Sequence, residues 1–237
     1  MAVICAGSPP AALAAKAATS AIPIVFLSGD DPNKIGLVAS FNRPGGNVTG
    51  VSVLIERLGA KRFGLLREIV PSAALIAVLL NPTEPTFDAQ LNDVQEAAQA
   101  IGQRIEVLRA STEREIDESF ATAVRLRAEA MLVGISFFYT IRREQLVSLA
   151  AQTSLPTIYG QREYASAGGL ISYASDLADA YRLAGNYTGR VLKGEKPGDL
   201  PVLQPTRFEL VINLKTAKAL GVKISDNLLS LADEVIE

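Results

Sequence analysis

Short apolar runs alternate with stretches of helical periodicity along the whole chain. The runs that predict strands lie at 2–7, 22–28, 48–52, 75–81, 104–110, 130–135, 156–160, 169–174 and 207–214. Between most of them, apolar positions recur every three or four residues, which is the pattern of a helix with one buried face. Strands that alternate with such helices are typical of a parallel sheet with helices on both faces. The pattern therefore predicts an α/β fold.

Polar residues and glycines mark the predicted ends of several helices. Asp31 precedes a short helix, and Asp176 begins a long helix that ends at Gly194. Thr112 and Glu115 have the spacing of a capping box. The predicted helices lie at 9–20, 31–41, 56–71, 87–102, 112–128, 140–154, 161–168, 176–194 and 214–221, with a helical tail at 225–237.

The strands divide into two groups, which indicates two Rossmann-like lobes with parallel sheets. Five strands complete one doubly wound lobe, whereas residues 1–70 supply only three. The strand at 207–214 could join these three. We therefore predict an incomplete first lobe over 1–72 plus 193–237, and a second lobe over 73–192. Ligands of such folds bind at the carboxyl ends of the strands, and between the lobes where there are two.

Composition narrows the function classes. The net charge is −2 and the Lys and Arg residues are scattered, which argues against a nucleic-acid binder. The sequence contains no apolar run of about 18 residues, so no transmembrane helix is expected. With a single cysteine, Cys5, the chain has no internal disulfide, and the apolar run around it predicts an inert, buried thiol.

Several catalytic and cofactor motifs are missing from the sequence. The chain contains no histidine, which removes the usual general base, most zinc sites and the Ser-His or Cys-His dyads. It has neither a P-loop nor a G-x-G-x-x-G motif. We therefore expect no metal and no cofactor, and we favour a binding protein over an enzyme.

Polar residues follow three of the predicted strands. Ser8 and the N–H groups of the helix after it could hold a carboxylate or phosphate, or Ser8 could simply cap that helix. Asp31 could meet a cationic group or cap a turn, and Asn81 is a turn former whose amide could also face a ligand. Because all three residues follow strands of predicted parallel sheets, they are candidate ligand contacts.

Aromatic residues gather at the ends of later strands. The densest group is SFFY at 136–139, which contains Phe137 and lies at the end of an interior strand. Such a group either fills the core or forms the wall of a binding site. Tyr159 and Tyr173 stand at the ends of the next two strands, and Asp176 either caps its helix or faces an ammonium group. These four residues complete the candidate contacts.

Three stretches carry a resemblance to a known family. They are IPIVFLSGDDPNKIGLVASFNRPGGNVTGVS from residue 22, YGQREYASAGGLISYASD from residue 159 and LPVLQPTRFELVINLKTAKALGVKISDNLLSLADEVIE from residue 200. Together they are similar to the substrate-binding proteins of a bacterial ABC-importer family often labelled tryptophan/tyrosine transport. The resemblance implies a two-lobed fold like that of type I periplasmic binding proteins. It also implies a small amino-acid-like ligand and ABC permease subunits as partners.

The resemblance also bears on the start of the chain. Members of the family normally begin with a signal peptide and then a βαβα unit, ahead of the segment that matches AVICAG at 2–7. This sequence has neither, so we expect an N-terminally truncated first lobe with an exposed sheet edge, at which chains self-associate. A periplasmic location is implied by the resemblance, although this chain carries no signal peptide.

The Gly-rich stretch RPGGNVTGVS resembles the family's turn into a strand at the edge region of the first lobe. Gly45 and Gly46 permit backbone angles that a side chain would forbid, and Asn47 tolerates the same region. We therefore expect a structural turn that directs residues 48–51 into the sheet. For Thr49, a structural role and a position facing the cleft are the two alternatives.

These observations combine into one hypothesis, a substrate-binding component of an ABC importer. The first lobe offers Ser8 and helix N–H groups to a carboxylate. The second lobe offers Phe137, Tyr159 and Tyr173 as aromatic walls, with Asp176 for an ammonium group. Two other classes stay open, namely an enzyme on a two-lobed α/β frame and a ligand-sensing regulatory module.

Overall fold

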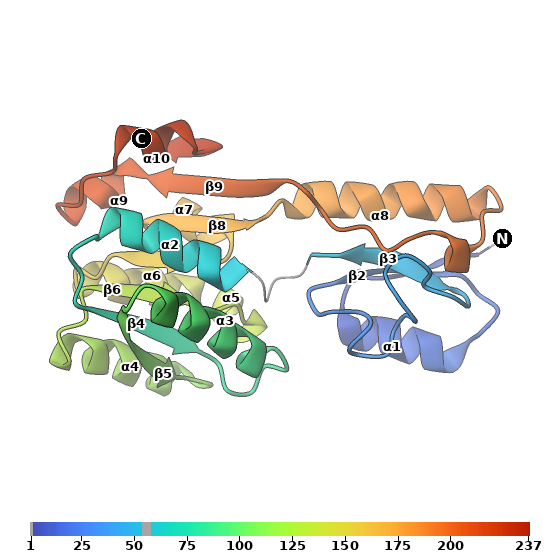
Figure 1. Ribbon diagram of the computed structural model, residues 1–237, viewed down its shortest axis with the longest axis horizontal. Coiled ribbons are helices and arrows are strands. Elements are labelled where there is room, and N and C mark those ends of the chain that lie inside the picture. Colours follow the sequence, from blue (N-terminus) through green and yellow to red (C-terminus); the bar gives the residue numbers. More distant parts are fainter. Residues whose placement is uncertain (1, 54–57) are drawn as a thin grey trace. The chain divides into compact units, whose positions relative to one another are not determined.

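The computed structural model describes residues 2–53 and 58–237, and the chain divides into two compact units (Figure 1). Unit 1 comprises Met1–Ile55 and Ser175–Phe208. Unit 2 comprises Glu56–Ala174 and Glu209–Glu237. Each unit is therefore built from two segments that lie far apart in the sequence.

These boundaries correct the predicted ones. Residues 56–72 and 209–237 were expected in the first lobe but belong to unit 2, whereas residues 175–192 were expected in the second lobe but belong to unit 1. The physical reason is packing. Phe63 of the first segment and Ile212 of the second lie in one hydrophobic cluster with the strands of unit 2.

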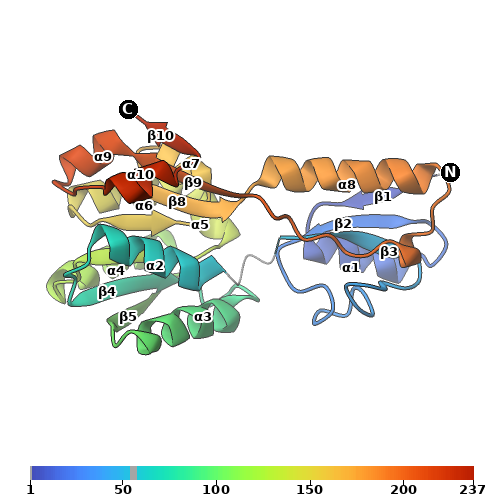
Figure 2. The ribbon, with the colours of Figure 1, turned by 45° about the horizontal axis from the view of Figure 1, so that its top comes forward.

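Unit 1 contains a three-stranded parallel sheet with the order β1-β2-β3. Alternate residues of β2 point to opposite faces of this sheet, so Ile24 and Phe26 pack with α1, whereas Val25 and Leu27 pack with α8. The two helices therefore cover opposite faces (Figure 2). The elements of this unit are β1 (Ile4–Ala6), α1 (Pro9–Ala18), β2 (Ile24–Ser28), β3 (Val48–Ser52), α8 (Leu177–Leu192) and the 3₁₀ helix η2 (Pro197–Asp199).

The segment after β2 forms turns instead of the predicted helix at 31–41. Asp31 Oδ1 accepts from the N–H groups of Asn33 at 3.0 Å and Lys34 at 3.3 Å, which closes a turn. Gly36 then takes a left-handed conformation with φ of 73°. Because a left-handed residue cannot continue a right-handed helix, the turn ends there.

The predicted Gly-rich turn before β3 is confirmed. The angle φ is 73° at Gly45 and 61° at Gly46, in the left-handed region that favours glycine. The strand that follows lies at an edge of the three-stranded sheet. Thr49 has the structural role, because its side chain is buried and its hydroxyl donates to the carbonyl oxygen of Leu200 at 2.8 Å.

Unit 2 contains a seven-stranded sheet with the order β10-β9-β8-β7-β6-β4-β5. Its strands β4 to β8 pair parallel, as predicted. Parallel strands place their carboxyl ends along one side of a sheet, and we call the ends of β4, β6 and β7 the carboxyl edge of unit 2. The strands are β4 (Leu75–Leu80), β5 (Arg104–Arg109), β6 (Ala130–Val133), β7 (Thr157–Tyr159), β8 (Ile171–Ser175), β9 (Phe208–Asn213) and β10 (Glu234–Ile236).

The last two strands depart from the predicted pattern. β9 pairs with β8 instead of joining the first lobe: the N–H of Asn213 donates to the carbonyl oxygen of Leu170 at 2.9 Å, and that of Asp176 to Arg207 at 3.1 Å. Along these bonded pairs the residue numbers rise on β8 while they fall on β9, so the two strands run antiparallel. The tail forms only a short helix, α10 (Asp226–Ser230), and then the strand β10, which pairs parallel with β9.

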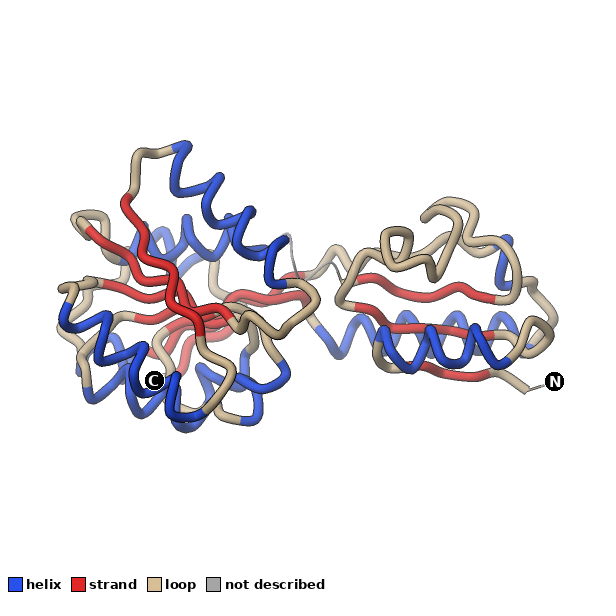
Figure 3. Tube along the Cα trace, turned by 90° about the horizontal axis from the view of Figure 1, so that it is seen from below, coloured by secondary structure: helices blue, strands red, loops and turns tan. Residues whose placement is uncertain are grey.

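Helices cover both faces of the sheet in unit 2 (Figure 3). Neighbouring residues of a strand point to opposite faces, so Ile76 and Val78 join one hydrophobic cluster, and Ala77 and Leu79 join the other. The first cluster includes residues of α2 (Gly59–Ile69), α3 (Phe87–Ala100), α9 (Leu214–Ala219) and α10. The second includes residues of α4 (Glu113–Arg125), α5 (Phe137–Ile141), α6 (Arg143–Gln152) and α7 (Arg162–Ser166).

Candidate ligand-binding site

Asn81 directly follows β4 and organises the carboxyl edge of unit 2. Its side chain is buried, and its Nδ2 donates to Ser136 Oγ at 3.0 Å. Its Oδ1 accepts from the N–H of Thr83 at 3.0 Å and from the hydroxyl of Thr83 at 2.8 Å. Ser136 in turn donates to Glu84 Oε1 at 2.7 Å. Asn81 therefore forms a turn and also links the ends of β4 and β6.

Phe137 presents its ring to solvent at the start of α5. Ser136 caps this helix, and the N–H of Phe137 donates to Glu84 Oε1 at 3.1 Å. The backbone is thereby held, while 76% of the Phe137 surface stays exposed. The neighbouring Tyr139 is buried, and its hydroxyl donates to the carbonyl oxygen of Ala110 at 2.8 Å. The aromatic group at 136–139 thus places one ring in the core and one at the surface, and the role of Phe137 as a binding wall stays a prediction.

Gln90 on α3 holds the chain just before this cap. Its Oε1 accepts from the N–H of Ile135 at 2.7 Å, and its Nε2 donates to the carbonyl oxygen of the same residue at 2.9 Å. The Gln90 side chain is itself buried. One buried amide therefore satisfies both backbone groups of Ile135, and it fixes the direction in which Ser136 and Phe137 leave the sheet.

The end of β7 brings a further polar group to the carboxyl edge. The hydroxyl of Thr140 donates to Gln161 Oε1 at 2.9 Å, which links α5 to the residue before α7. Gly160 precedes Gln161 and packs closely against the face covered by α2. A Cβ built on Gly160 would come within 2.3 Å of Arg62 Nη1 and 2.5 Å of Ile135 Cγ1.

The predicted rings of Tyr159 and Tyr173 lie on opposite faces of the sheet. Tyr159 is completely buried in the cluster of α4 to α7, where its ring stacks on Tyr164 with centroids 4.6 Å apart. Burial raises the pKa of Tyr159 above its ordinary value. Tyr173 packs against the other cluster and is partly buried. These two rings therefore do not share one wall, and Tyr159 has no surface left for a ligand in this structure.

Ser8 caps α1, but the first turn of that helix has no N–H groups to spare. Ser8 Oγ accepts from the N–H of Ala11 at 3.4 Å, and its carbonyl oxygen accepts from Ala12 at 3.0 Å. Pro9 and Pro10 occupy the first two helical positions and carry no N–H. In this structure the first turn therefore has no unbonded N–H group for a carboxylate, and Ser8 stays a predicted contact.

Both predicted aspartates of unit 1 serve as caps. Asp31 accepts from two N–H groups in the turn after β2. Asp176 caps α8, where its Oδ1 accepts from the N–H of Asp179 at 3.0 Å. Each carboxylate has its capping role, and contact with an ammonium group stays a prediction for both.

Arg62 was not among the predicted contacts, and it is a buried charge. It lies on α2 with 1% of its surface exposed, and its Nε donates to the carbonyl oxygen of Leu58 at 3.2 Å. Burial lowers the pKa of Arg62 to about 10, an effect that the nearby Asp93 carboxylate opposes. Arg62 Nη1 meets no hydrogen-bond acceptor within residues 2–53 and 58–237. The sequence holds a signal for this position, since Arg62 lies four residues from both Leu58 and Leu66 on the apolar face of the helix.

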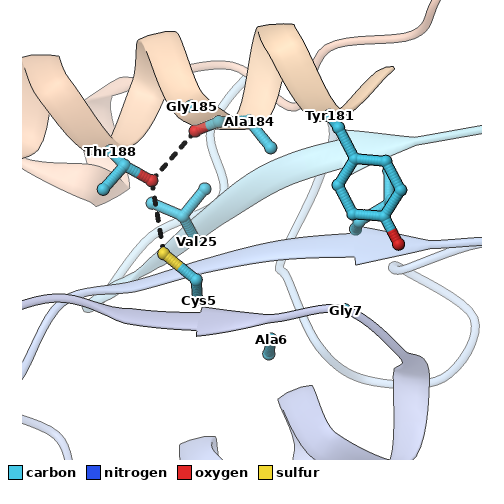
Figure 4. A pocket seen from close by; sticks show the side chains of 9 residues that line it. Cys5, Ala6, Gly7, Val25, Tyr181, Ala184, Gly185 and Thr188 are labelled. Atoms are coloured by element: carbon cyan, nitrogen blue, oxygen red, sulfur yellow. Dashed lines mark hydrogen bonds between the residues drawn. The ribbon is translucent and has the colours of Figure 1, made fainter. Parts of the chain in front are cut away.

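A separate hollow of about 420 Å³ lies within unit 1, between α8 and the strands β1 and β2 (Figure 4). Cys5 lines it and is exposed, so the prediction of a buried thiol is wrong. The reason is that β1 lies at an edge of the sheet. The thiol points toward α8, where its Sγ lies 3.5 Å from Thr188 Oγ1.

The carboxyl edge of unit 2 carries groups that are typical of ligand-binding sites. It combines an exposed aromatic ring, side-chain amides and a carboxylate, which suit stacking and hydrogen bonding. In the described part of the chain, no group of three His, Cys, Asp or Glu side chains is placed to hold a metal ion. None of the described helices is long and apolar enough to cross a membrane.

Comparison with known proteins gives consistent matches along the chain. A profile of the family described as ABC transporter substrate binding protein matches residues 1–236. A tyrosine-binding protein of Clostridioides difficile (strain R20291) is 28% identical over 221 residues, which cover 93% of this chain. This chain spans 63% of the length of that curated relative.

Solved structures agree with the sequence matches. An ABC domain from Streptococcus pneumonia in complex with L-Trp superposes with a TM-score of 0.84 at 28% identity, covering 99% of this chain and 80% of that one. A conserved domain protein from Vibrio cholerae gives a TM-score of 0.84 at 26% identity, covering 98% and 78%. The predicted α/β fold of two Rossmann-like units, like that of type I periplasmic binding proteins, is thereby confirmed.

Proposed function

Because the chain belongs to the family of ABC transporter substrate-binding proteins, we propose that it binds a small amino-acid-like ligand and presents it to an ABC importer. Aromatic amino acids are the preferred ligands in this proposal. The family works outside the cytoplasm, and we place this chain in the periplasm, with the permease subunits as its protein partners.

One observation supports aromatic amino acids as the ligand class. Two of the matched relatives are identified by an aromatic amino acid, since one is a tyrosine-binding protein and the other was solved in complex with L-Trp. Both matches cover more than nine tenths of this chain. The similarity therefore extends over both units rather than over one shared motif.

The carboxyl edge of unit 2 supports the same ligand class. Stacking on the exposed ring of Phe137 contributes roughly 0.5–1.5 kcal/mol beyond the buried area. The network of Asn81, Ser136 and Glu84 holds the backbone that carries this ring, and Gln161, which is bonded to Thr140, adds an amide at the same edge. In this proposal Phe137 contacts the aromatic side chain of the ligand, and the polar groups contact its amino-acid part.

Ser8, Asp31 and Asp176 are the proposed contacts from unit 1. Each has an oxygen at a helix or turn start after a strand, where ligands of parallel sheets bind. Of the remaining predicted residues, Tyr173 stays a candidate, whereas Tyr159 is left out because its ring is enclosed in the core.

The experiment is a titration of the purified protein with each of the twenty amino acids, followed by calorimetry and by melting temperature. We expect tyrosine or tryptophan to release or absorb heat on binding and to raise the melting temperature, because a ligand that binds only the folded state stabilises it. Binding of none of the twenty would contradict the proposal. Turnover of a bound amino acid would instead favour an enzyme.

A further inference from the structure

The guanidinium of Arg62 is a buried positive charge whose hydrogen bonding is incomplete. Its Nη1 has no acceptor within the described part of the chain, and its exposed fraction is 1%. None of the ion pairs between described residues includes Arg62. A buried charge that has no ion-pair partner and has an unbonded donor destabilises a protein, so its presence calls for a compensating role.

The nearby Asp93 carboxylate does not neutralise Arg62 by direct contact. Asp93 Oδ2 accepts from the N–H of Ala60 at 2.9 Å, so it is used at the start of α2. It acts on Arg62 only through space. The guanidinium thus keeps a positive potential in surroundings of low dielectric constant.

The position of this charge is as informative as its burial. Arg62 Nη1 lies under Gly160, at the point where β7 reaches the carboxyl edge, and Ile135 at the end of β6 packs beside it. Only the backbone of Gly160 occupies this place, because any side chain there would collide with Nη1. The charge therefore lies directly below the strand ends that carry Phe137 and Gln161.

The same edge needs a positive charge if its ligand is an amino acid. The helix that was expected to hold the carboxylate, α1, begins with two prolines, and its next N–H groups are bonded to Ser8. The N–H groups of α1, which were predicted to hold the ligand carboxylate, are therefore not available to it. Arg62 supplies a charge of the right sign at the right edge.

We propose that Arg62 is the group that makes the carboxyl edge of unit 2 select ligands with a carboxylate. From its position beneath Gly160, the charge of Arg62 attracts the carboxylate of the ligand through space. The arginine determines specificity in this way although it is itself buried. This inference rests on the proposed function, and it deepens it by assigning the preference for an acid over its amide to one residue.

The test compares Arg62→Met with Arg62→Lys, using L-tyrosine, L-tryptophan and the corresponding amides as probes. In the unchanged protein the acids bind more tightly than the amides. In Arg62→Met, affinity for the acids falls about tenfold, and affinity for the amides changes little. Arg62→Lys retains most of the preference. Arg125→Met is the matched control, because it removes the same charge from an exposed position on α4 and leaves the preference unchanged.

A second variant keeps the inference testable if Arg62→Met does not fold. Asp93→Asn retains an oxygen for the N–H of Ala60 but removes the opposing negative charge. It should strengthen the preference for acids about twofold to threefold. Equal changes for acids and amides in both variants would overturn the inference. If the unchanged protein binds none of the four probes, the proposed function fails instead.

Discussion

The side chain of Gln90 and the backbone of Ile135 form a closed pair of hydrogen bonds, 2.7 Å and 2.9 Å long, at the end of β6. Through this pair, a helix sets the direction of the chain as it leaves the sheet. Ser136 and Phe137 follow directly, so the pair also determines where the exposed ring lies. The geometry of the candidate site thus depends on a residue that does not belong to it.

Replacing Gln90 by leucine should weaken both stability and binding. Both backbone groups of Ile135 would lose their partner in a partly buried position, and we expect the free energy of unfolding to fall by about 2–3 kcal/mol. Urea unfolding measures this change. Gln99→Leu, at an exposed position of the same helix, is the matched control and should leave stability within about 0.5 kcal/mol of the unchanged protein. Equal effects of the two variants would contradict the role of the pair.

Replacing Phe137 by alanine should affect binding but not folding. Because 76% of this residue is exposed, its removal leaves the core intact. Affinity for tyrosine or tryptophan should fall about threefold to tenfold, while the melting temperature stays nearly constant. Phe138→Ala is the comparison, since Phe138 packs against a core cluster and its loss should lower the melting temperature. Unchanged affinity in Phe137→Ala would remove this ring from the site.

Arg62→Met should make the protein more stable. Methionine fills a similar volume and removes a desolvated charge, so we expect the free energy of unfolding to rise by about 1–3 kcal/mol. Chemical denaturation at neutral pH measures it. A clear loss of stability would instead indicate that the arginine serves the core, and the selection of carboxylates would then need another explanation.

Glu115 should make a pH-dependent contribution to stability. It completes the predicted capping box with Thr112, and hydrogen bonds from Ser111 and Thr112 lower the pKa of its carboxyl below the ordinary value. A lowered folded-state pKa means that the stabilisation is fully present above the unfolded-state value of 4.5 and is lost as pH falls through the folded-state pKa. The stability difference between the unchanged protein and Glu115→Gln should therefore shrink from pH 7 to pH 3. A constant difference would contradict this assignment.

Cys5 should react with a thiol reagent while the protein is folded. The side chain is exposed on the edge strand β1, so one equivalent of thiol should be titrated by Ellman's reagent without denaturant. A buried thiol would react only after unfolding. Cys5→Ser should abolish the signal and leave the melting temperature close to that of the unchanged protein.

Much of the candidate site could be located from the sequence, but not its internal arrangement. Asn81, Phe137 and Gln161 follow predicted strands, and parallel strands bring their ends to one edge, so this edge could be foreseen. The faces of the sheet on which Tyr159 and Tyr173 lie could not be predicted, because they depend on where each strand begins and on which helices cover it. Arg62 was missed because a charged residue within an amphipathic helix is usually at its surface.

The sequence by itself determined the features that depend on near neighbours in the chain. These include the alternation of strands and helices, the capping box at Thr112 and Glu115, and the turn at Gly45 and Gly46, since capping spacings and glycine angles are local properties. Only the tertiary structure decided that β9 pairs antiparallel with β8, that α2 belongs to unit 2, and that Arg62 is buried beneath Gly160. Each of these depends on contacts between segments that are far apart in the sequence, and local patterns carry no information about which distant surface a residue will meet.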